Sequence, residues 1–235
     1  MPVDRGIHAK PSGAGNDPKL RVIDFGERSF YHLPIADRTI ILLMSDTALT
    51  PASDVHEKLL RATEHLIYAG GINATGMDLI VKTSGVSRKT IYNHYGTKEV
   101  LVAAALTARD DRWMQWFIDA TTRAPSPRAR LLSIFDALRE WFASDGFRGC
   151  AFINAAGEIG DADSPIRAVA RRHKERLLAH VLSLVQAAGL PHADERARQL
   201  LVLIDGAIAV AMVTGDASIT DSAERAAQAL LDADH

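Results

Sequence analysis

The sequence contains a single cysteine, Cys150, among its 235 residues. One cysteine excludes an intramolecular disulfide and any metal site built from cysteines alone. Aromatic residues make up only 6% of the chain, and leucine and alanine dominate an apolar fraction of 47%, a composition that favours helix over strand. The net charge is only −2, so any binding of nucleic acid must depend on a local basic patch.

The sequence also lacks the long apolar runs of membrane proteins and the motifs of common catalytic sites. The longest apolar run, residues 200–213, is too short to span a bilayer and contains Asp205, and we see no secretory signal. We therefore expect a cytoplasmic protein with no membrane partner. The nine histidines show no metal-ligand spacing on one helical face, and no Gly-rich phosphate loop or Ser-His-Asp order is present. We expect no metal, no cofactor and no enzymatic activity.

Two short helices joined by a tight turn are predicted in the first half of the chain. The first covers about residues 76–83, and Gly85 can end it because glycine enters the left-handed region at little steric cost. Ser87 can then cap the second helix by accepting a hydrogen bond from a free backbone N–H. The segment from Lys82 to Lys98, both included, contains four cationic side chains and no acidic one. This pattern is typical of a helix-turn-helix, whose second helix enters the DNA major groove.

At these residues the sequence resembles the DNA-binding domain of the TetR family of bacterial transcriptional regulators. The matching residues are Gly85-Val86-Ser87, Thr90-Ile91-Tyr92, His94-Tyr95, Gly96-Thr97-Lys98-Glu99 and Leu101. The match covers roughly residues 55–105. It implies a homodimeric repressor that binds a palindromic operator in double-stranded DNA and is released by a small-molecule inducer. The alternatives are an activator or constitutive regulator without a small ligand, and, from another class, an all-helical ligand carrier or enzyme.

The predicted fold is all-α, with about nine helices. We expect a three-helix, helix-turn-helix DNA-binding domain over residues 53–100, followed by a helical ligand-binding and dimerisation domain over residues 101–235. A first helix is predicted to start at Asp54. Residues 1–52, rich in turn-forming residues at 11–18, are predicted to be a disordered extension.

The family's usual short lead before its first helix suggests a second interpretation of the extension. Met44 is then the natural start, and residues 1–43 are translated upstream sequence.

The second helix of the pair supplies most of the predicted DNA contacts. Ile91 and Tyr95 can face the core, which leaves the other side chains outward. The predicted DNA-binding residues are Ser87, Arg88, Lys89, Thr90, Tyr92, Asn93, His94 and Lys98. Lys98, in the first turn of a long helix over about 97–120, is assigned to a phosphate. Tyr92 is alternatively a half-buried wedge between the two helices.

An aromatic cluster in the second domain is the predicted ligand pocket. Its members, with possible polar partners, are Trp113, Trp116, Phe117, Phe135, Trp141, Phe152, Asn154 and His173. Glu158 is a further polar candidate. Because the cluster is mostly apolar, a small apolar or aromatic inducer is expected. The alternative is that these aromatic residues form plain core. Cys150 is either a redox switch or, as a small apolar residue, part of that core.

The helix over residues 200–213 is apolar on nearly every side and must be covered all round. One face can pack on its own domain, and the small residues of the other permit close approach of a second copy. The predicted dimer-interface residues are Leu200, Leu203, Ile204, Ala207, Ile208 and Ala211. A central core helix of a monomer is the alternative.

Overall fold

The computed structural model describes residues 21–25, 28–32 and 51–233, and the chain divides into two units at Thr50. In the first unit β1 (Arg21–Phe25) and β2 (Arg28–His32) pair antiparallel, with Arg21 opposite His32. This short hairpin lies in the stretch that the sequence predicts to be disordered. The apolar run at 39–44 and the proposed start at Met44 lie outside the described residues.

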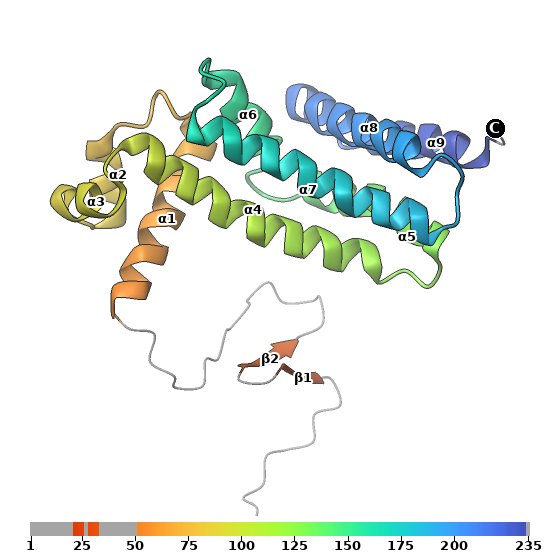
Figure 1. The fold of residues 1–235 in the computed structure, drawn as a ribbon, viewed down its shortest axis with the longest axis horizontal. Coiled ribbons are helices and arrows are strands. Elements are labelled where there is room, and N and C mark those ends of the chain that lie inside the picture. The colour runs from red at the N-terminus through yellow and green to blue at the C-terminus, as the bar shows by residue number, and fades with distance from the viewer. Residues whose placement is uncertain (1–20, 26–27, 33–50, 234–235) are drawn as a thin grey trace, which may run out of the picture. The chain divides into compact units, whose positions relative to one another are not determined.

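Residues 51–233 form nine helices, which confirms the predicted all-α fold of this part of the chain (Figure 1). They are α1 (Pro51–Gly70), α2 (Met77–Ser84), α3 (Arg88–Tyr95), α4 (Lys98–Thr122), α5 (Pro127–Phe142), α6 (Ala151–Glu158), α7 (Pro165–Ala187), α8 (Ala193–Thr214) and α9 (Ile219–Asp232). Three helix starts follow from local sequence, because the hydroxyls of Ser87, Thr97 and Ser126 each accept a hydrogen bond from a backbone N–H three residues on. Helix α1 begins at Pro51, earlier than the predicted Asp54, because proline suits a first helical turn.

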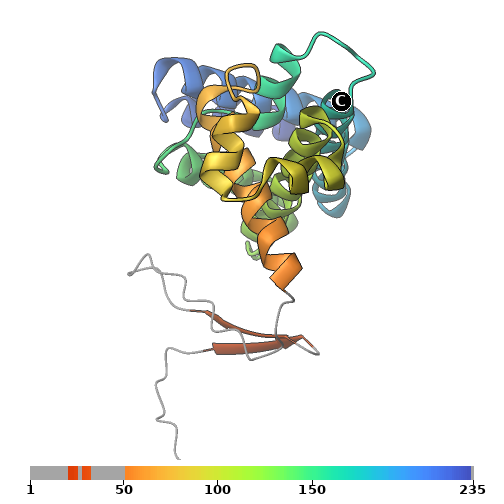
Figure 2. The same ribbon diagram turned by 90° about the vertical axis from the view of Figure 1, so that its left-hand side faces the viewer.

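Helices α1, α2 and α3 form the head, which has its own small core. Leu59, Ile80, Val86, Ile91 and Leu101 are all buried and pack together there. Gly85 joins α2 to α3 with φ of 73°, a left-handed conformation that glycine adopts without the strain of a Cβ atom. Figure 2 looks onto this end of the helical unit and shows the three head helices in front of the others.

Helices α4 to α9 form the body. Helix α4 packs against both α1 and α7 and so runs from the head into the body (Figure 1). Helices α8 and α9 pack together on the side of the body away from α3. A second, larger core fills the body and includes the fully buried Phe117, Phe135 and Leu177.

Helix α8 corrects the predicted dimer face. Five of the six predicted interface residues are buried in the body's own core with at most 3% exposure; they are Leu200, Ile204, Ala207, Ile208 and Ala211. Only Leu203 is partly exposed. The outward face of α8 instead carries Val202 (70% exposed), Val210 and Val213 (79% exposed), with Gly206 and Ala209 between them. An all-round apolar sequence identifies such a helix but cannot show which face turns inward.

Helix α8 is also longer than the apolar run that the sequence suggests. By length and composition alone, it is the one helix among the described residues apolar enough to cross a membrane, although core helices of soluble proteins pass the same test. A third of the relevant window is buried against the body.

Candidate DNA interface and its link to the body

Helix α3 turns one face toward the head core and the other toward solvent. Ile91 is 1% exposed and anchors the inner face. Lys89, Tyr92, Asn93 and His94 lie on the outer face, and Tyr92 keeps 41% of its surface exposed. Their side chains have no hydrogen-bond partner in the described part of the chain. These four side chains are therefore free to bind bases or phosphates, and the wedge interpretation of Tyr92 loses support.

Other predicted DNA-binding residues already have partners within the head. Arg88 forms an ion pair with Asp78 at the start of α2. The hydroxyls of Ser87 and Thr90 lie 2.8 Å apart and share a hydrogen bond. The Nζ atom of Lys98 donates to the carbonyl oxygen of Ile72 over 2.6 Å. In this arrangement Lys98 stabilises the turn between α1 and α2 with one of its three N–H donors, and its assignment to a phosphate stays a prediction.

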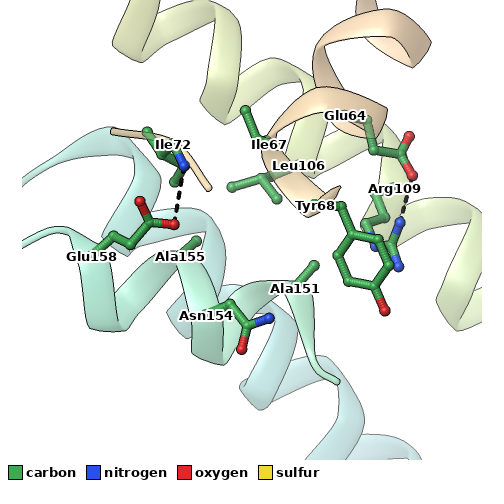
Figure 3. A pocket seen from close by; sticks show the side chains of 10 residues that line it. All are labelled: Glu64, Ile67, Tyr68, Ile72, Leu106, Arg109, Ala151, Asn154, Ala155 and Glu158. Atoms are coloured by element: carbon green, nitrogen blue, oxygen red, sulfur yellow. Dashed lines mark hydrogen bonds and ion pairs between the residues drawn. The ribbon is translucent and has the colours of Figure 1, made fainter. Parts of the chain in front are cut away.

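The same turn is also bound by the body. The carboxylate of Glu158, at the end of α6, accepts hydrogen bonds from the backbone N–H groups of Ile72 and Asn73, at 3.0 and 2.9 Å. Figure 3 shows Glu158 pointing from α6 toward Ile72, across a gap between α1, α4 and α6. Gly71 has φ of 89°, and a Cβ atom there would lie 3.1 Å from the Glu158 carboxylate. The turn therefore requires glycine for two separate reasons.

Tyr68 makes a second link between head and body. Its hydroxyl donates to the carbonyl oxygen of Gly149 and accepts from the N–H of Arg148, both over 2.9 Å. The guanidinium of Arg109 lies 3.9 Å from the centre of the Tyr68 ring and also pairs with Glu64 on α1. Burial raises the pKa of Tyr68, so its hydroxyl stays a donor at neutral pH. Helix α6 is thus bound to the head at both of its ends.

The predicted aromatic pocket is closed in this structure. Of its predicted members, Trp113, Trp141, Phe152 and His173 line one cavity, whose free volume is about 10 Å³, close to what one water molecule needs. The remaining four do not line it. Phe117 and Phe135 are fully buried core residues, Trp116 packs beside them, and Asn154 donates to the carbonyl oxygen of Arg148.

A buried polar network lies against this cavity. Asp110 is fully buried, and its carboxylate bonds to His173 Nδ1 at 2.7 Å and to Arg176 at 2.6 Å. Burial alone would raise the pKa of Asp110, but these hydrogen bonds outweigh it and lower the pKa below its ordinary value. Burial likewise opposes the charged form of His173, yet hydrogen bonds to Asp110 and Cys150 leave its pKa raised.

Cys150 belongs to the same network and is the N-cap of α6. Its Sγ atom accepts a hydrogen bond from the N–H of Ile153 over 3.5 Å. Burial raises the pKa of its thiol, but the hydrogen bond with His173 and the charge of Lys174 bring the pKa below its ordinary value. With 4% exposure the thiol is a core residue, as the second of the two sequence interpretations has it.

Sequence reasoning missed several of these residues. Glu158 appears there only as a polar group for the pocket, and Tyr68 and Asp110 do not appear at all. Asp110 stands in the charged run Arg109-Asp110-Asp111-Arg112, so the local sequence gives no signal that its carboxylate is buried. Within the described residues no group of three or more His, Cys, Asp or Glu side chains is arranged to hold a metal ion.

Two sequence profiles match the chain, one over each part of the helical unit. The profile described as bacterial regulatory proteins of the tetR family matches residues 59–105, which include α2 and α3. The profile described as the tetracyclin repressor-like C-terminal domain matches residues 127–227, from α5 into α9.

Individual relatives are regulators too. AcuR, a transcriptional regulator of Cereibacter sphaeroides, is 28% identical over 151 residues, which cover 61% of this chain and 68% of AcuR. An HTH-type transcriptional regulator in the lacX 3′ region of Lactococcus lactis subsp. lactis is 23% identical over 175 residues, or 71% of this chain and 87% of that protein.

Solved structures share the fold. SCO4454, a TetR-family transcriptional regulator from Streptomyces coelicolor, matches with a TM-score of 0.70 at 26% identity, over 76% of this chain and 95% of that one. The reduced form of NemR from E. coli matches with a TM-score of 0.68 over 76% of this chain and 97% of that one, and at 18% identity it shows the fold alone. Because the two profiles together cover both the head and most of the body, the chain belongs to the TetR family of bacterial transcriptional regulators.

Proposed function

We propose that this regulator is a cytoplasmic, non-enzymatic repressor that binds a palindromic operator in duplex DNA as a homodimer and releases it when a small-molecule inducer binds. The observation that supports this most directly is the outer face of α3, where Lys89, Tyr92, Asn93 and His94 are exposed and unpartnered in the described chain. Lysine pairs with guanine and asparagine with adenine in the major groove, so the face can both bind and read sequence.

The outward face of α8 supports the homodimer. Val202 and Val213 are 70% and 79% exposed, and the small residues Gly206 and Ala209 lie between them. Helix α9, which packs beside α8, turns the small residues Ala226 and Ala229 outward. Two such helix pairs can associate about a two-fold axis as a four-helix bundle. Paired heads would then meet half-sites one DNA turn apart, roughly 34 Å.

The links between head and body support release by an inducer. Helix α6 contacts the head through Glu158, the loop before α6 contacts it through Tyr68, and α4 is continuous from one part to the other. A ligand that binds one arrangement of the body more tightly than another shifts the population between them. The heads would move when the body changes arrangement, because α6 and α4 both contact them.

The test is selection of bound DNA fragments from genomic DNA by the purified full chain, followed by footprinting. We expect enrichment of a palindrome whose two protected half-sites lie one helical turn apart, with affinity that falls steeply as salt rises. Selection that enriches no fragment, even at low salt, would contradict the proposal. If the enriched operator in a reporter strain is derepressed without any added ligand, the inducer is no longer part of the proposal.

A further inference from the structure

An open groove lies between α6 and α7, on the other side of Phe152 from the closed aromatic cavity. It has about 240 Å³ of space, against about 10 Å³ in that cavity. The residues that line it are Phe152, Ile153 and Ala156 from α6, and Arg167, Ala170, Arg171 and Lys174 from α7. The gap between α1, α4 and α6 also has only about 10 Å³, so the groove is the largest of these three spaces beside α6.

The groove has an apolar floor. Phe152 and Ala170 are 3% and 7% exposed, so they form a packed surface with a fixed shape. Ile153 is 39% exposed and leaves a branched apolar side chain open to water at the edge of the groove. Covering such surface with hydrocarbon is favourable, at roughly 25 cal/mol per Å².

The rim of the groove is cationic. Arg167, Arg171 and Lys174 are spaced four and three residues apart and so share one face of α7. No acidic residue lines the groove. Lys174 is neutralised by Asp205 of α8 at 2.5 Å, whereas Arg167 uses one N–H to bind the carbonyl oxygen of Ala156 at 2.7 Å.

Arg171 differs from its two neighbours on the rim. It is exposed, and in the described part of the chain its guanidinium has neither a hydrogen-bond nor an ion-pair partner. A guanidinium binds carboxylate oxygens in a two-bond, charge-assisted geometry. Arg171 and the remaining donors of Arg167 thus leave an uncompensated positive site directly above an apolar floor.

We propose that this groove is the inducer site and that its ligand is a small carboxylate with a hydrocarbon body. The inference rests on the proposed function for its regulatory role. The groove's space of about 240 Å³ is many times the roughly 10–15 Å³ that one water molecule needs, so it can admit a small organic molecule. The hydrocarbon covers Phe152 and Ile153, and the carboxylate pairs with Arg171. The expected inducer is therefore anionic, a property that the small apolar or aromatic molecule expected from the aromatic cluster did not include.

The position of the groove connects the ligand to the head. Its α6 wall ends at Glu158, whose carboxylate binds the Ile72 and Asn73 N–H groups of the head. Its floor residue Phe152 stacks on the His173 ring at 3.8 Å between centres. A ligand that draws α6 toward α7 changes the position of Glu158 and so favours a head arrangement that no longer fits both half-sites.

The first test measures binding of hexanoate to the full chain by NMR titration, without DNA. We expect saturable binding of hexanoate, with hexanol and acetate each at least ~10-fold weaker, because one lacks the charge and the other the hydrocarbon. Arg171→Gln should weaken hexanoate at least ~10-fold, and Arg171→Lys should retain most of the affinity. The matched control is Arg172→Gln, because Arg172 is adjacent in sequence but bonds to Thr107 of α4, outside the groove. It should bind hexanoate like the unaltered chain.

Equal hexanoate affinity in Arg171→Gln and the unaltered chain, or no hexanoate binding at all, would overturn the proposal. The DNA readout keeps this apart from the proposed function. If the chain binds its selected operator but not hexanoate, the proposed function stands and the groove is excluded as the inducer site. Operator release by hexanoate, lost in Arg171→Gln and kept in Arg172→Gln, is the result expected if the groove is the inducer site.

Discussion

The carboxylate of Glu158 accepts a hydrogen bond from the backbone N–H of Ile72 over 3.0 Å, although 86 residues separate them in sequence. Glu158 ends α6 of the body, and Ile72 begins the turn between the first two head helices. Because Asn73 N–H bonds to the same carboxylate, one side chain holds the turn at two points. Any displacement of α6 must therefore either carry this turn along or break two charge-assisted hydrogen bonds.

Glu158→Gln should weaken this link without changing the size of the side chain. The amide offers one acceptor oxygen and no charge, so we expect a loss of about 1–2 kcal/mol in the free energy of unfolding. Urea denaturation followed by circular dichroism measures it. The control is Glu175→Gln on α7, an exposed glutamate with no partner in the described chain, which should change the midpoint little. Identical midpoints for the two variants would show that the Glu158 bonds contribute nothing.

Gly71→Ala should destabilise the same turn from the other side. The alanine backbone would have to keep φ of 89°, and this left-handed conformation alone costs roughly 1–2 kcal/mol. Its Cβ atom would also lie 3.1 Å from the Glu158 oxygens. Gly70→Ala is the matched control, since Gly70 belongs to α1 and a Cβ atom there meets nothing within 4 Å. We expect Gly70→Ala to be neutral or slightly stabilising. Thermal unfolding of both variants checks this, and an equal effect of the two would contradict the account.

Val213→Asp should separate the proposed dimer. Val213 is 79% exposed on the outward face of α8, so the change leaves the fold of one chain unaffected but places a charge in an apolar interface. Light scattering should give twice the chain mass of 25.5 kDa for the unaltered protein and the single-chain mass for the variant. Val55→Asp, at an exposed valine of α1, should leave the mass of the assembly unchanged. A single-chain mass for the unaltered protein would exclude this interface.

His173→Gln tests the buried network through its pH dependence. The pKa of His173 is raised, so its stabilising effect is complete below the ordinary value of 6.5 and is lost as pH rises through the raised folded value. The pKa of Asp110 is lowered, so its contribution is present above 3.8 and is lost as pH falls through the lowered folded value. We expect the variant to lose about 1–3 kcal/mol near pH 6 and less near pH 9.

His180→Gln is the control for that measurement. His180 bonds to Thr121 at 2.8 Å, and burial lowers its pKa. A lowered histidine pKa gives the opposite trend, because the neutral form is favoured in the folded chain and acid then destabilises it. The cost of His180→Gln should thus shrink as the pH falls. Parallel pH profiles for the two variants would contradict the assigned protonation of His173.

The sequence predicts what is set locally in this chain. Ser87, Thr97 and Ser126 each act within three residues, and each caps the helix that follows it. The helix-turn-helix follows for the same reason, since Gly85 and Ser87 fix the turn and the alternation of Ile91 with exposed residues fixes the face of α3.

Features that depend on tertiary packing could not be predicted in the same way. The apolar residues around α8 fit the core and the outside equally well, so the pattern did not reveal that Ile204 lies inward and Val202 outward. Lys98 carries the sequence signal of a phosphate ligand, yet folding brings it to the Ile72 carbonyl 26 residues away. In the sequence the aromatic residues resemble the lining of a pocket, but in the folded chain they pack into a closed core.

The central claim is that the outer face of α3 reads DNA, and Tyr92→Ala tests it most directly. The measurement is equilibrium binding of the full chain to its selected operator and to a scrambled duplex, with fluorescence anisotropy. The control is His65→Ala, at an exposed residue of α1 outside α3. We predict at least a ~10-fold loss of operator affinity for Tyr92→Ala, equivalent to about 1.4 kcal/mol, with a smaller ratio between operator and scrambled duplex and no such loss for His65→Ala. Unchanged affinity and an unchanged ratio in Tyr92→Ala would contradict the assignment of α3 as the helix that reads the operator.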